Sequence, residues 1–409
     1  MPSPKGNALV GQSGGPTCVI NQSLVGIVEE CLASDAVRSV YGAIHGLRGI
    51  LDENLVDLGR ETRSTLEAVA GTPCAGLRSV RMKPTRADCA AALEVLRAHD
   101  VRYFFYIGGN DTAETANLLN EVAVAEGYEL RLFHVPKTID NDLRVTDHCP
   151  GYGSAARFVA QALMGDDQDN RSLPGIKIDV IMGRDAGWLT ASSVLARTYE
   201  GAGPHLIYLP ETAFSMDGFL ADVEGAYRTH GRCLVAVSEG IRDAEGTLIA
   251  KSKEVDEFGN MQLSGSGALG DLLAAAVKSG LGASLRVRAD TFGYLQRSFF
   301  GAASEVDAAE AREVGRTAVR VATAGDVPHG SIIIEREAGP EYRARFGVTE
   351  LANVARHTRP LEPHFIRGTN DIAEEFLDYV RPLVGALPRP GILAEHFVAK
   401  RLDRSAAGS

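Results

Sequence analysis

Apolar runs alternate with glycine-rich or acidic turns along most of this chain, and the spacing within each run separates strands from helices. Runs of roughly four to eight mostly apolar residues predict buried strands, and apolar residues three and four positions apart predict helices. The expected strands are 7–10, 39–43, 103–107, 130–135, 176–182, 206–211, 233–240 and 330–335. The expected helices are 19–33, 87–99, one starting near 113, 153–163, one ending at 197, 303–324 and 371–384.

The segments between these elements are predicted to be turns and loops. Residues 42–49 are a glycine-rich connection, and the acidic stretch 166–174 is typical of a polar loop. Thr112 stands before an expected helix and is available to cap it. Beyond about residue 340 we expect an extension packed on the core, and we assign no chemistry to it.

One turn, residues 136–142, combines a cation, a hydroxyl, two carboxylates and an amide in the sequence Pro-Lys-Thr-Ile-Asp-Asn-Asp. It follows the expected strand 130–135, and open α/β sheets bind ligands at the C-terminal ends of their strands. A lysine to oppose phosphate charge and a carboxylate to take a proton or hold a metal suit phosphoryl transfer. Aspartate and asparagine are also common turn residues, so the segment alone is equally compatible with an acidic turn.

A second turn, Gly11-Gln-Ser-Gly-Gly-Pro-Thr17, joins an expected strand to an expected helix. Glycines allow the backbone to approach a phosphate closely, and the N–H groups at a helix start face the anion. The turn has neither the G-x-G-x-x-G pattern of dinucleotide sites nor the Gly-Lys-Ser/Thr of a Walker loop. A plain strand-to-helix turn remains the alternative.

Composition narrows the class of protein. At 409 residues the chain is long enough for two or three domains, and 45% hydrophobic with 23% charged residues is ordinary for a globular protein. A net charge of −11 argues against nucleic acid as a partner, and it means that an anionic substrate needs a locally built positive site.

Targeting and redox signals are few. The N-terminus carries no signal-peptide h-region and no apolar run is long enough to span a bilayer, so we expect a cytoplasmic protein with no membrane partner. The six cysteines have no C-x-x-C spacing, which favours buried or half-buried thiols over a zinc site or disulfides.

The heptapeptide at 136–142 is letter for letter the active-site signature of the phosphofructokinases, and at least four further motifs follow in that family's order. These are the first loop 11–17, Gly108-Gly-Asn-Asp-Thr112, Met182-Gly-Arg184 with Gly187-Trp-Leu189, and Arg288-x4-Gly-Tyr294-x-Gln-Arg297. The chain therefore resembles the phosphofructokinases over roughly residues 6–335. The resemblance implies an α/β fold of two doubly wound, Rossmann-like three-layer domains, with the active site in the cleft between them.

The same resemblance suggests a division of the chain. Residues 1–150 would form the donor-binding domain, completed by about 297–335, and residues 151–296 would bind the sugar phosphate. Residues 336–409 would be the C-terminal extension.

Two positions indicate the phosphoryl donor that the resemblance implies. ATP-using bacterial members carry Gly-Gly-Asp-Gly-Ser where this chain has Asn110 and Asp111, and a carboxylate at 111 would crowd and repel a nucleotide α-phosphate. Many of those members also have glycine in place of Lys137, whereas pyrophosphate users have lysine. Asp111 with Lys137 therefore indicates pyrophosphate, with Gly15 and Arg81 also shaping the donor site. A surface arginine is the alternative for Arg81, and Arg78 stands where glycine is usual.

For the acceptor, the resemblance implies fructose 6-phosphate. The residues expected to contact it are Thr138, Asp140, Met182, Gly183, Arg184, Glu239, Arg288, Tyr294 and Arg297. Two arginines can clamp one phosphate in ways that lysine cannot. A solvated strand-end glutamate is the alternative for Glu239. Bacterial relatives place an arginine from a neighbouring subunit near position 175, where this chain has Gly175 and, two residues on, Lys177.

The implied reaction is reversible phosphoryl transfer from pyrophosphate to the 1-hydroxyl of fructose 6-phosphate. Asp140 would act as general base, Asp142 would support it, and Thr138 and Lys137 would hold the transferring group. Magnesium is the implied cofactor, with Asn110 and Asp142 as its expected ligands, and a homodimer or homotetramer is the expected assembly.

Three other functions stay open at this point. An ATP-dependent phosphofructokinase is disfavoured by Asp111. A non-catalytic regulatory paralogue is disfavoured by the intact Thr138, Asp140 and Asp142. A nucleotide-binding dehydrogenase lacks its G-x-G-x-x-G pattern.

Overall fold

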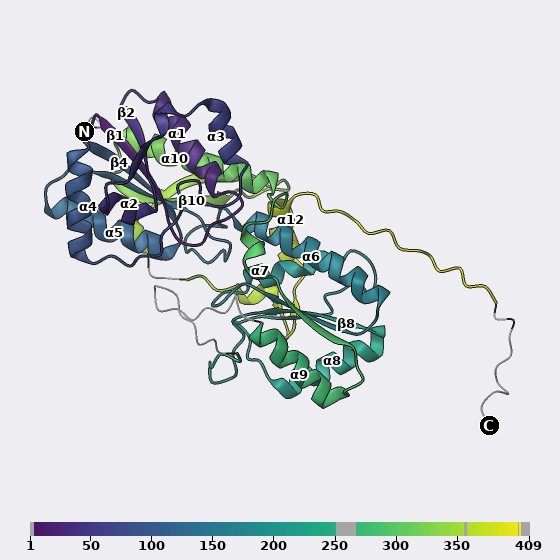
Figure 1. Cartoon of the computed structure of the whole chain (residues 1–409). Coiled ribbons are helices and arrows are strands. Elements are labelled where there is room, and N and C mark those ends of the chain that lie inside the picture. The colour runs from purple at the N-terminus through teal and green to yellow at the C-terminus, as the bar shows by residue number, and fades with distance from the viewer. Residues whose placement is uncertain (1–3, 251–266, 356–357, 400, 402–409) are drawn as a thin grey trace.

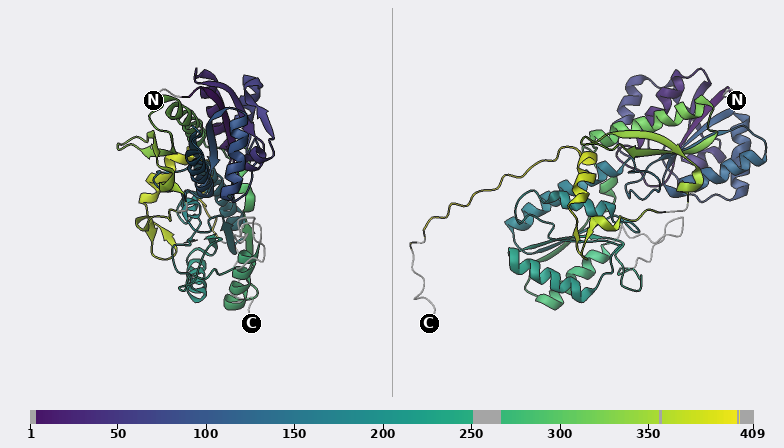
Figure 2. Two further views of the ribbon diagram at one scale, coloured as in Figure 1. Left: turned by 90° about the vertical axis from the view of Figure 1, so that its left-hand side faces the viewer. Right: turned by 180° about the vertical axis from the view of Figure 1, so that it is seen from behind.

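The computed structural model describes residues 4–250, 267–355, 358–399 and 401. Within these residues the chain forms two bodies side by side, each built on a sheet with helices on both faces (Figure 1). Figure 2 shows that α10 and β10, late in the sequence, lie in the same body as the N-terminus. This is the α/β architecture of two three-layer units that the motifs led us to expect.

The first sheet has seven strands in the order β11-β10-β5-β4-β1-β2-β3. They are β1 (Gly6–Gln12), β2 (Val37–Ala43), β3 (Leu55–Asp57), β4 (Val101–Gly108), β5 (Arg131–Pro136), β10 (His329–Arg336) and β11 (Ala344–Thr349). The pairs are parallel except β3 on β2 and β11 on β10. Its helices are α1 (Ile20–Ala33), α2 (Gly46–Leu51), α3 (Arg63–Ala70), α4 (Arg86–Ala98), α5 (Asn110–Ala125), α10 (Glu305–Ala324) and α11 (Leu351–Val354).

Successive side chains of the central strands enter different cores because a strand alternates its two faces. Tyr103 and Phe105 pack with α1 and α10, whereas Phe104 and Tyr106 pack with α4 and α5. Both faces are therefore covered, which explains why these strands read as continuous apolar runs rather than as alternating ones.

The second sheet has four parallel strands in the order β7-β8-β6-β9. They are β6 (Ile176–Ile181), β7 (Leu206–Tyr208), β8 (Cys233–Ser238) and β9 (Val287–Thr291). Around them lie α6 (Tyr152–Ser172), α7 (Trp188–Ala191), α8 (Met216–His230), α9 (Ala268–Leu281) and α12 (Glu375–Val384), with a two-stranded ribbon of β12 (Ile366–Arg367) and β13 (Asp371–Ile372). Four short 3₁₀ turns complete the described elements: η1 (Leu58–Arg60), η2 (Ser192–Ala196), η3 (Gly293–Arg297) and η4 (Pro363–Phe365).

Several expected boundaries are wrong. Residues 166–172, expected in a loop, extend α6 because Asp167 and Asn170 face inward and are hydrogen-bonded there. Thr112 does not cap α5, since the helix starts at Asn110 with Gly109 before it. The connection 42–49 contains the start of α2, and the last helix begins at Glu375 rather than at 371.

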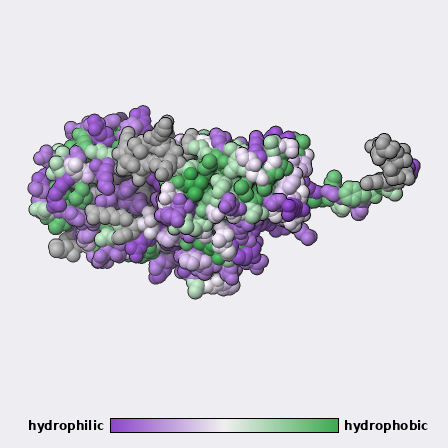
Figure 3. All heavy atoms as spheres, turned by 90° about the horizontal axis from the view of Figure 1, so that it is seen from below, coloured by the Kyte–Doolittle hydropathy of each residue, from purple (hydrophilic) through white to green (hydrophobic). Residues whose placement is uncertain are grey.

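The surface and the C-terminal segment complete the picture. Viewed from below, the molecule is largely polar, with apolar side chains gathered near the middle of the face (Figure 3). Beyond α12 the chain leaves the body as an extended segment (Figure 1). Glu395 in this segment forms an ion pair with Arg171 of α6, with 3.0 Å between the charged atoms.

No helix in the described part of the chain is both long and apolar enough to cross a bilayer. The described cysteines are free, and all except the half-buried Cys74 are buried.

Candidate active site

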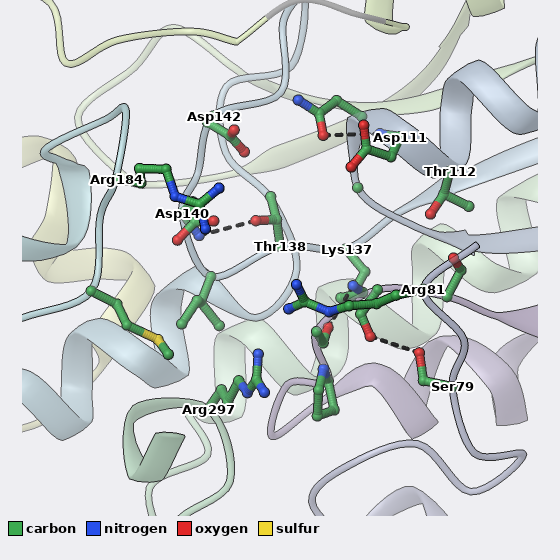
Figure 4. A pocket seen from close by; sticks show the side chains of 18 of the residues that line it. Ser79, Arg81, Asp111, Thr112, Lys137, Thr138, Asp140, Asp142, Arg184 and Arg297 are labelled. Carbon is green, nitrogen blue, oxygen red and sulfur yellow. Dashed lines mark hydrogen bonds between the residues drawn. The ribbon is translucent and has the colours of Figure 1, made fainter. Parts of the chain in front are cut away.

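A cavity of about 760 Å³ opens between the two bodies. The loops that follow β1, β4 and β5 of the first sheet and β6 and β8 of the second reach it, because parallel strands place their C-terminal ends at one edge. Most expected site residues line it: Gly15, Arg81, Asn110, Asp111, Lys137, Thr138, Asp140, Asp142, Met182, Arg184, Glu239, Tyr294 and Arg297. The sequence motifs therefore converge on one site (Figure 4).

The segment 137–142 is fixed by the backbone turn at Asn141 and by side-chain hydrogen bonds of Asn141 and Thr138. Asn141 adopts a φ of 56°, a left-handed conformation that asparagine tolerates better than most residues. Its buried amide group accepts a hydrogen bond from the Cys149 N–H at 2.9 Å and donates one to the Tyr379 hydroxyl at 2.7 Å. The Thr138 hydroxyl accepts from the Asp140 N–H at 3.1 Å. With Asn141 turned inward, Asp140 and Asp142 are left facing the cavity.

Cationic groups gather opposite these carboxylates. Lys137 is 3% exposed, and its ammonium donates to the carbonyl oxygen of Gly15 at 2.6 Å. A Cβ at position 15 would lie 2.5 Å from a guanidinium nitrogen of Arg297 and 3.9 Å from one of Arg81. The guanidinium groups of Arg297 and Arg81 therefore approach Gly15 closely, and with Lys137 they place three positive side chains beside the first loop.

The electrostatics of the two carboxylates suit proton transfer. Burial raises the pKa of Asp140, and the positive charge of Arg184, which lies beside it in Figure 4, opposes the shift. Burial and the charge of Asp140 together raise the pKa of Asp142 to about 7. Two neighbouring carboxyl groups share protons in this way because both cannot ionise freely.

The pKa of the buried lysine shifts in the opposite direction, downward. Burial and the nearby charge of Arg297 lower the pKa of Lys137 to about 7. Burial and Arg81 likewise lower the pKa of Arg297. Such crowded, partly desolvated cations are stabilised by a bound anion, so this end of the cavity is built to accept a highly charged phosphate.

The N-terminus of α5 forms another wall of the cavity. Asn110 and Asp111 occupy its first turn, and the Asn110 side-chain oxygen accepts from the Asp111 N–H at 2.9 Å. A helix start favours anions. The exposed carboxylate of Asp111 adds a negative charge at the same place, so it limits how far an anionic ligand can extend in this direction.

The opposite wall comes from the second body. The Met182 N–H donates to the Gln296 side chain at 3.1 Å, which ties the turn after β6 to the η3 turn carrying Tyr294 and Arg297. Glu239 is 6% exposed at the end of β8. Gly183 does not itself line the cavity; it has a φ of 143°, and a Cβ there would lie 2.6 Å from the Ala186 carbonyl oxygen.

The structure does not bring every expected residue to the site. Arg288 lies outside the cavity, and its half-exposed guanidinium is 3.8 Å from Asp169 of α6. Lys177 does not replace the arginine missing at position 175, because its ammonium is held by Asp290, Asp166 and Asp179 on the α6 side of the sheet. Arg78 takes a φ of 60°, which is a conformation that glycine adopts more easily.

The sequence interpretation missed several residues of the cavity wall. These are Ser13, His45, Arg48, Ser79, Asp185 and Thr358, among others. Ser13 lies inside the recognised first loop and Asp185 directly after Arg184, so their neighbours gave a usable signal. Thr358 had none, since it lies more than 200 residues from the heptapeptide.

The assembled site combines a concentrated positive end, two carboxyl groups with raised pKa values and a polar opposite wall. Cations stabilise charge on a transferring phosphoryl group, and a carboxylate of raised pKa accepts a hydroxyl proton near neutral pH. The arrangement can therefore transfer a phosphoryl group to an alcohol.

Comparisons with known proteins agree with this chemistry. A family model described as Phosphofructokinase matches residues 7–322. The pyrophosphate–fructose 6-phosphate 1-phosphotransferase of Rhodospirillum rubrum is 51% identical over 406 residues, covering 98% of this chain and 100% of the relative. The solved pyrophosphate-dependent phosphofructokinase of Nitrosospira multiformis superposes with a TM-score of 0.83 at 32% identity, covering 97% of this chain and 99% of that one.

Proposed function

This chain belongs to the phosphofructokinase family, and we propose that it transfers a phosphoryl group from pyrophosphate to the 1-hydroxyl of fructose 6-phosphate. The products are fructose 1,6-bisphosphate and phosphate, and the reaction runs in both directions. The observation that carries the proposal is one cavity holding Asp140 beside Arg184, with Lys137 at its cationic end and Asp111 at the start of α5.

The mechanism follows from these positions. Asp140 accepts the proton of the sugar 1-hydroxyl as its oxygen attacks the nearer phosphorus of pyrophosphate. The bridging P–O bond breaks, and phosphate leaves toward Lys137, Arg81 and the first loop. Lys137 and Thr138 hold the transferring group and balance its charge, while Asp142 supports the base.

The sugar phosphate is oriented by the second body. Arg184, Glu239, Tyr294 and Arg297 line its wall of the cavity, and Met182 and Gly183 shape the turn between them. Holding both reactants for in-line attack supplies much of the rate enhancement of a phosphoryl transfer.

The donor end favours pyrophosphate over a nucleotide. The Asp111 carboxylate occupies the first turn of α5, where it repels an α-phosphate that continues toward a nucleoside. Lys137, buried against Gly15, supplies charge to the terminal phosphates. A compact donor with its charge concentrated near Lys137 fits these constraints.

Magnesium is part of the proposal, because Mg²⁺ binds through one or two carboxylates together with substrate phosphate oxygens. Asp142 offers such a carboxylate on the cavity wall. Asn110 also lines the cavity, but its side-chain oxygen already accepts a hydrogen bond from the Asp111 N–H, so we propose it as the weaker of the two metal ligands. The ion would neutralise pyrophosphate charge.

We also propose a homo-oligomer. Arg288 lies outside the cavity of its own chain, so its expected contact with the sugar phosphate requires a cavity belonging to a second chain. The same proposal divides the chain into a donor-binding domain (1–150 with 297–335), a sugar-phosphate-binding domain (151–296) and a C-terminal extension (336–409). It also includes a cytoplasmic location.

The test compares initial rates on fructose 6-phosphate and Mg²⁺ with pyrophosphate or ATP as the donor. We expect turnover with pyrophosphate and little or none with ATP. Turnover with ATP alone would refute the assignment of the donor, and absence of turnover with either would refute catalysis by this chain.

A further inference from the structure

The short segment 358–361 crosses between the two bodies directly behind the catalytic turn. Thr358 lines the cavity, the next residue is half-buried, and Leu361 is 1% exposed. We call residues 358–361 the strap. It belongs to the C-terminal part of the chain, to which the sequence motifs assign no chemistry.

One side chain of the strap holds the backbone around the two aspartates. The Arg359 guanidinium donates to the carbonyl oxygens of Thr146 at 2.7 Å, Asp147 at 2.8 Å and Asn141 at 3.2 Å. Its backbone N–H donates to the carbonyl oxygen of Asp142 at 2.6 Å. These contacts tie the backbone of the loop 141–147 to the strap.

The strap is anchored in the second body as well. The Arg359 guanidinium carbon lies 4.4 Å from the centre of the Trp188 ring, and the indole N–H donates to the Arg359 carbonyl oxygen at 3.2 Å. The Glu211 carboxylate accepts from the Leu361 N–H at 2.7 Å and from the Gly187 N–H at 2.8 Å. Arg359 is therefore fixed relative to the body that carries Arg184.

We propose that Arg359 is a positioning residue, which sets the place of Asp140 and Asp142 relative to the sugar-phosphate wall. The guanidinium donates from two separate nitrogens, one to Thr146 and the other to Asn141 and Asp147. The three donors of a lysine ammonium all radiate from one atom on a differently shaped side chain, so lysine does not reproduce this spread of contacts. Since a misplacement of about 1 Å can cost about a hundredfold in rate, losing these contacts should lower kcat. The phosphate contacts come from other elements, so KM should change little.

The test compares Arg359→Gln and Arg359→Lys with Arg197→Gln as the matched control. Arg197 also ties the C-terminal part to the second body, through Asp371 at 2.7 Å and the Pro204 carbonyl oxygen at 2.6 Å, but it touches no residue of the catalytic turn. We expect Arg359→Gln to lose about a hundredfold in kcat with KM for both substrates within about threefold of wild type. Arg359→Lys should lose nearly as much, and Arg197→Gln should keep its kcat.

Two further readouts separate positioning from a loss of fold. Trp188 is the only tryptophan, so its emission should shift in the Arg359 variants and not in Arg197→Gln. In Arg359→Ala, added guanidinium ion should restore part of kcat. The proposal is wrong if Arg359→Gln keeps kcat within threefold of wild type, or if its loss lies mainly in KM. It is also wrong if Arg197→Gln loses kcat equally.

This inference rests on the proposed function for its assay, and the two fail differently. A wild-type chain that is inactive with every donor refutes the function. If the wild type is active and Arg359→Gln is equally active, only the positioning role of Arg359 is refuted.

Discussion

At the scale of single residues, the site depends on opposite charges held out of water. Asp140 and Asp142 have raised pKa values and Lys137 a lowered one, so each group is nearer to neutrality than it would be in solvent. Such a balance is poised for proton transfer near neutral pH. The side chains of Lys137, Arg81 and Arg297 also supply the local positive site that an anionic substrate needs on a chain with a net charge of −11.

Replacing the proposed base should remove catalysis and leave binding. We expect Asp140→Asn to lower kcat by about 10²–10⁴, the usual contribution of a general base, because the amide cannot accept the hydroxyl proton. KM for pyrophosphate should stay near wild type, since Lys137 and Arg81 are untouched. Steady-state kinetics in both directions would check this. A variant that retained most of its kcat would exclude Asp140 as the base.

Removing the carboxylate at the start of α5 should widen donor choice. We expect Asp111→Gly to acquire measurable turnover with ATP, because the repulsion of a nucleotide α-phosphate is relieved, while activity with pyrophosphate persists. Glu121→Gln, an exposed change on the same helix, is the matched control and should acquire none. If Asp111→Gly remains inactive with ATP, another feature excludes the nucleotide.

At the scale of elements, buried polar groups lock the catalytic turn to its neighbours. The Asp307 carboxylate of α10 accepts hydrogen bonds from the Gly151 and Ser154 N–H groups at 2.8 Å, and so caps the start of α6 from another helix. His148, 2% exposed, bridges Asp147 at 2.8 Å and Glu310 of α10 at 2.6 Å. The segment between the turn and α6 is thus held by a helix from much later in the sequence.

The histidine bridge predicts a stability that falls in mild alkali. Burial disfavours the charged ring, but hydrogen bonds to Asp147 and Glu310 outweigh it and raise the pKa of His148 from 6.5 to about 9. The folded state therefore holds this proton more tightly than the unfolded state. The stabilisation is fully present below pH 6.5 and is lost as the pH rises through about 9, by at most about 1.4 kcal/mol per pH unit.

Thermal unfolding between pH 6 and 9.5 would measure this effect against His148→Gln. The variant should be less stable at pH 6, and its Tm should change less across this range than that of wild type. The variant keeps Arg336, which donates to Asp147, and Tyr342, whose hydroxyl lies within hydrogen-bond distance of position 148. Equal slopes for the two proteins would contradict the assignment.

At the scale of the whole molecule, residues of both bodies line the cavity, and one arginine of a shared motif lies outside it. Arg288 shares a motif with Arg297, yet Arg297 lines the cavity and Arg288 faces Asp169 outside it. Arg288 is the second residue of β9, whereas Arg297 ends the η3 turn that follows the C-terminal end of that strand, where the cavity lies.

Mixing inactive chains tests the shared site. If Arg288 serves the cavity of a partner, an equimolar mixture of Asp140→Asn and Arg288→Ala chains, assembled together, should regain roughly a quarter of wild-type activity, because about half of random dimers are mixed and each holds one intact site. Each variant alone should be impaired. Without recovery in verified mixed oligomers, Arg288 does not act across the interface.

The sequence by itself determined the local features of this protein. The eight expected strands, most of the expected helices, the loop 11–17 and the turn 136–142 were legible, whereas α3, α8, α9, β3, β9 and β11 were not expected. Each legible feature depends on residues close together in the chain, whose spacing fixes strand ends, tight turns and the groups that project from them. Even Arg78 stood out, and its left-handed backbone shows the physical reason for the usual glycine.

Only the tertiary structure decided which distant segments meet. The sequence placed 166–174 in a loop, because its polar side chains gave no sign that Asp167 and Asn170 are buried. It grouped Arg288 with the site and gave no reason to bring Thr358 and Arg359 to it. These positions follow from the path of the chain after β10 and from hydrogen bonds to backbone carbonyls, which carry no residue-specific signature in the sequence.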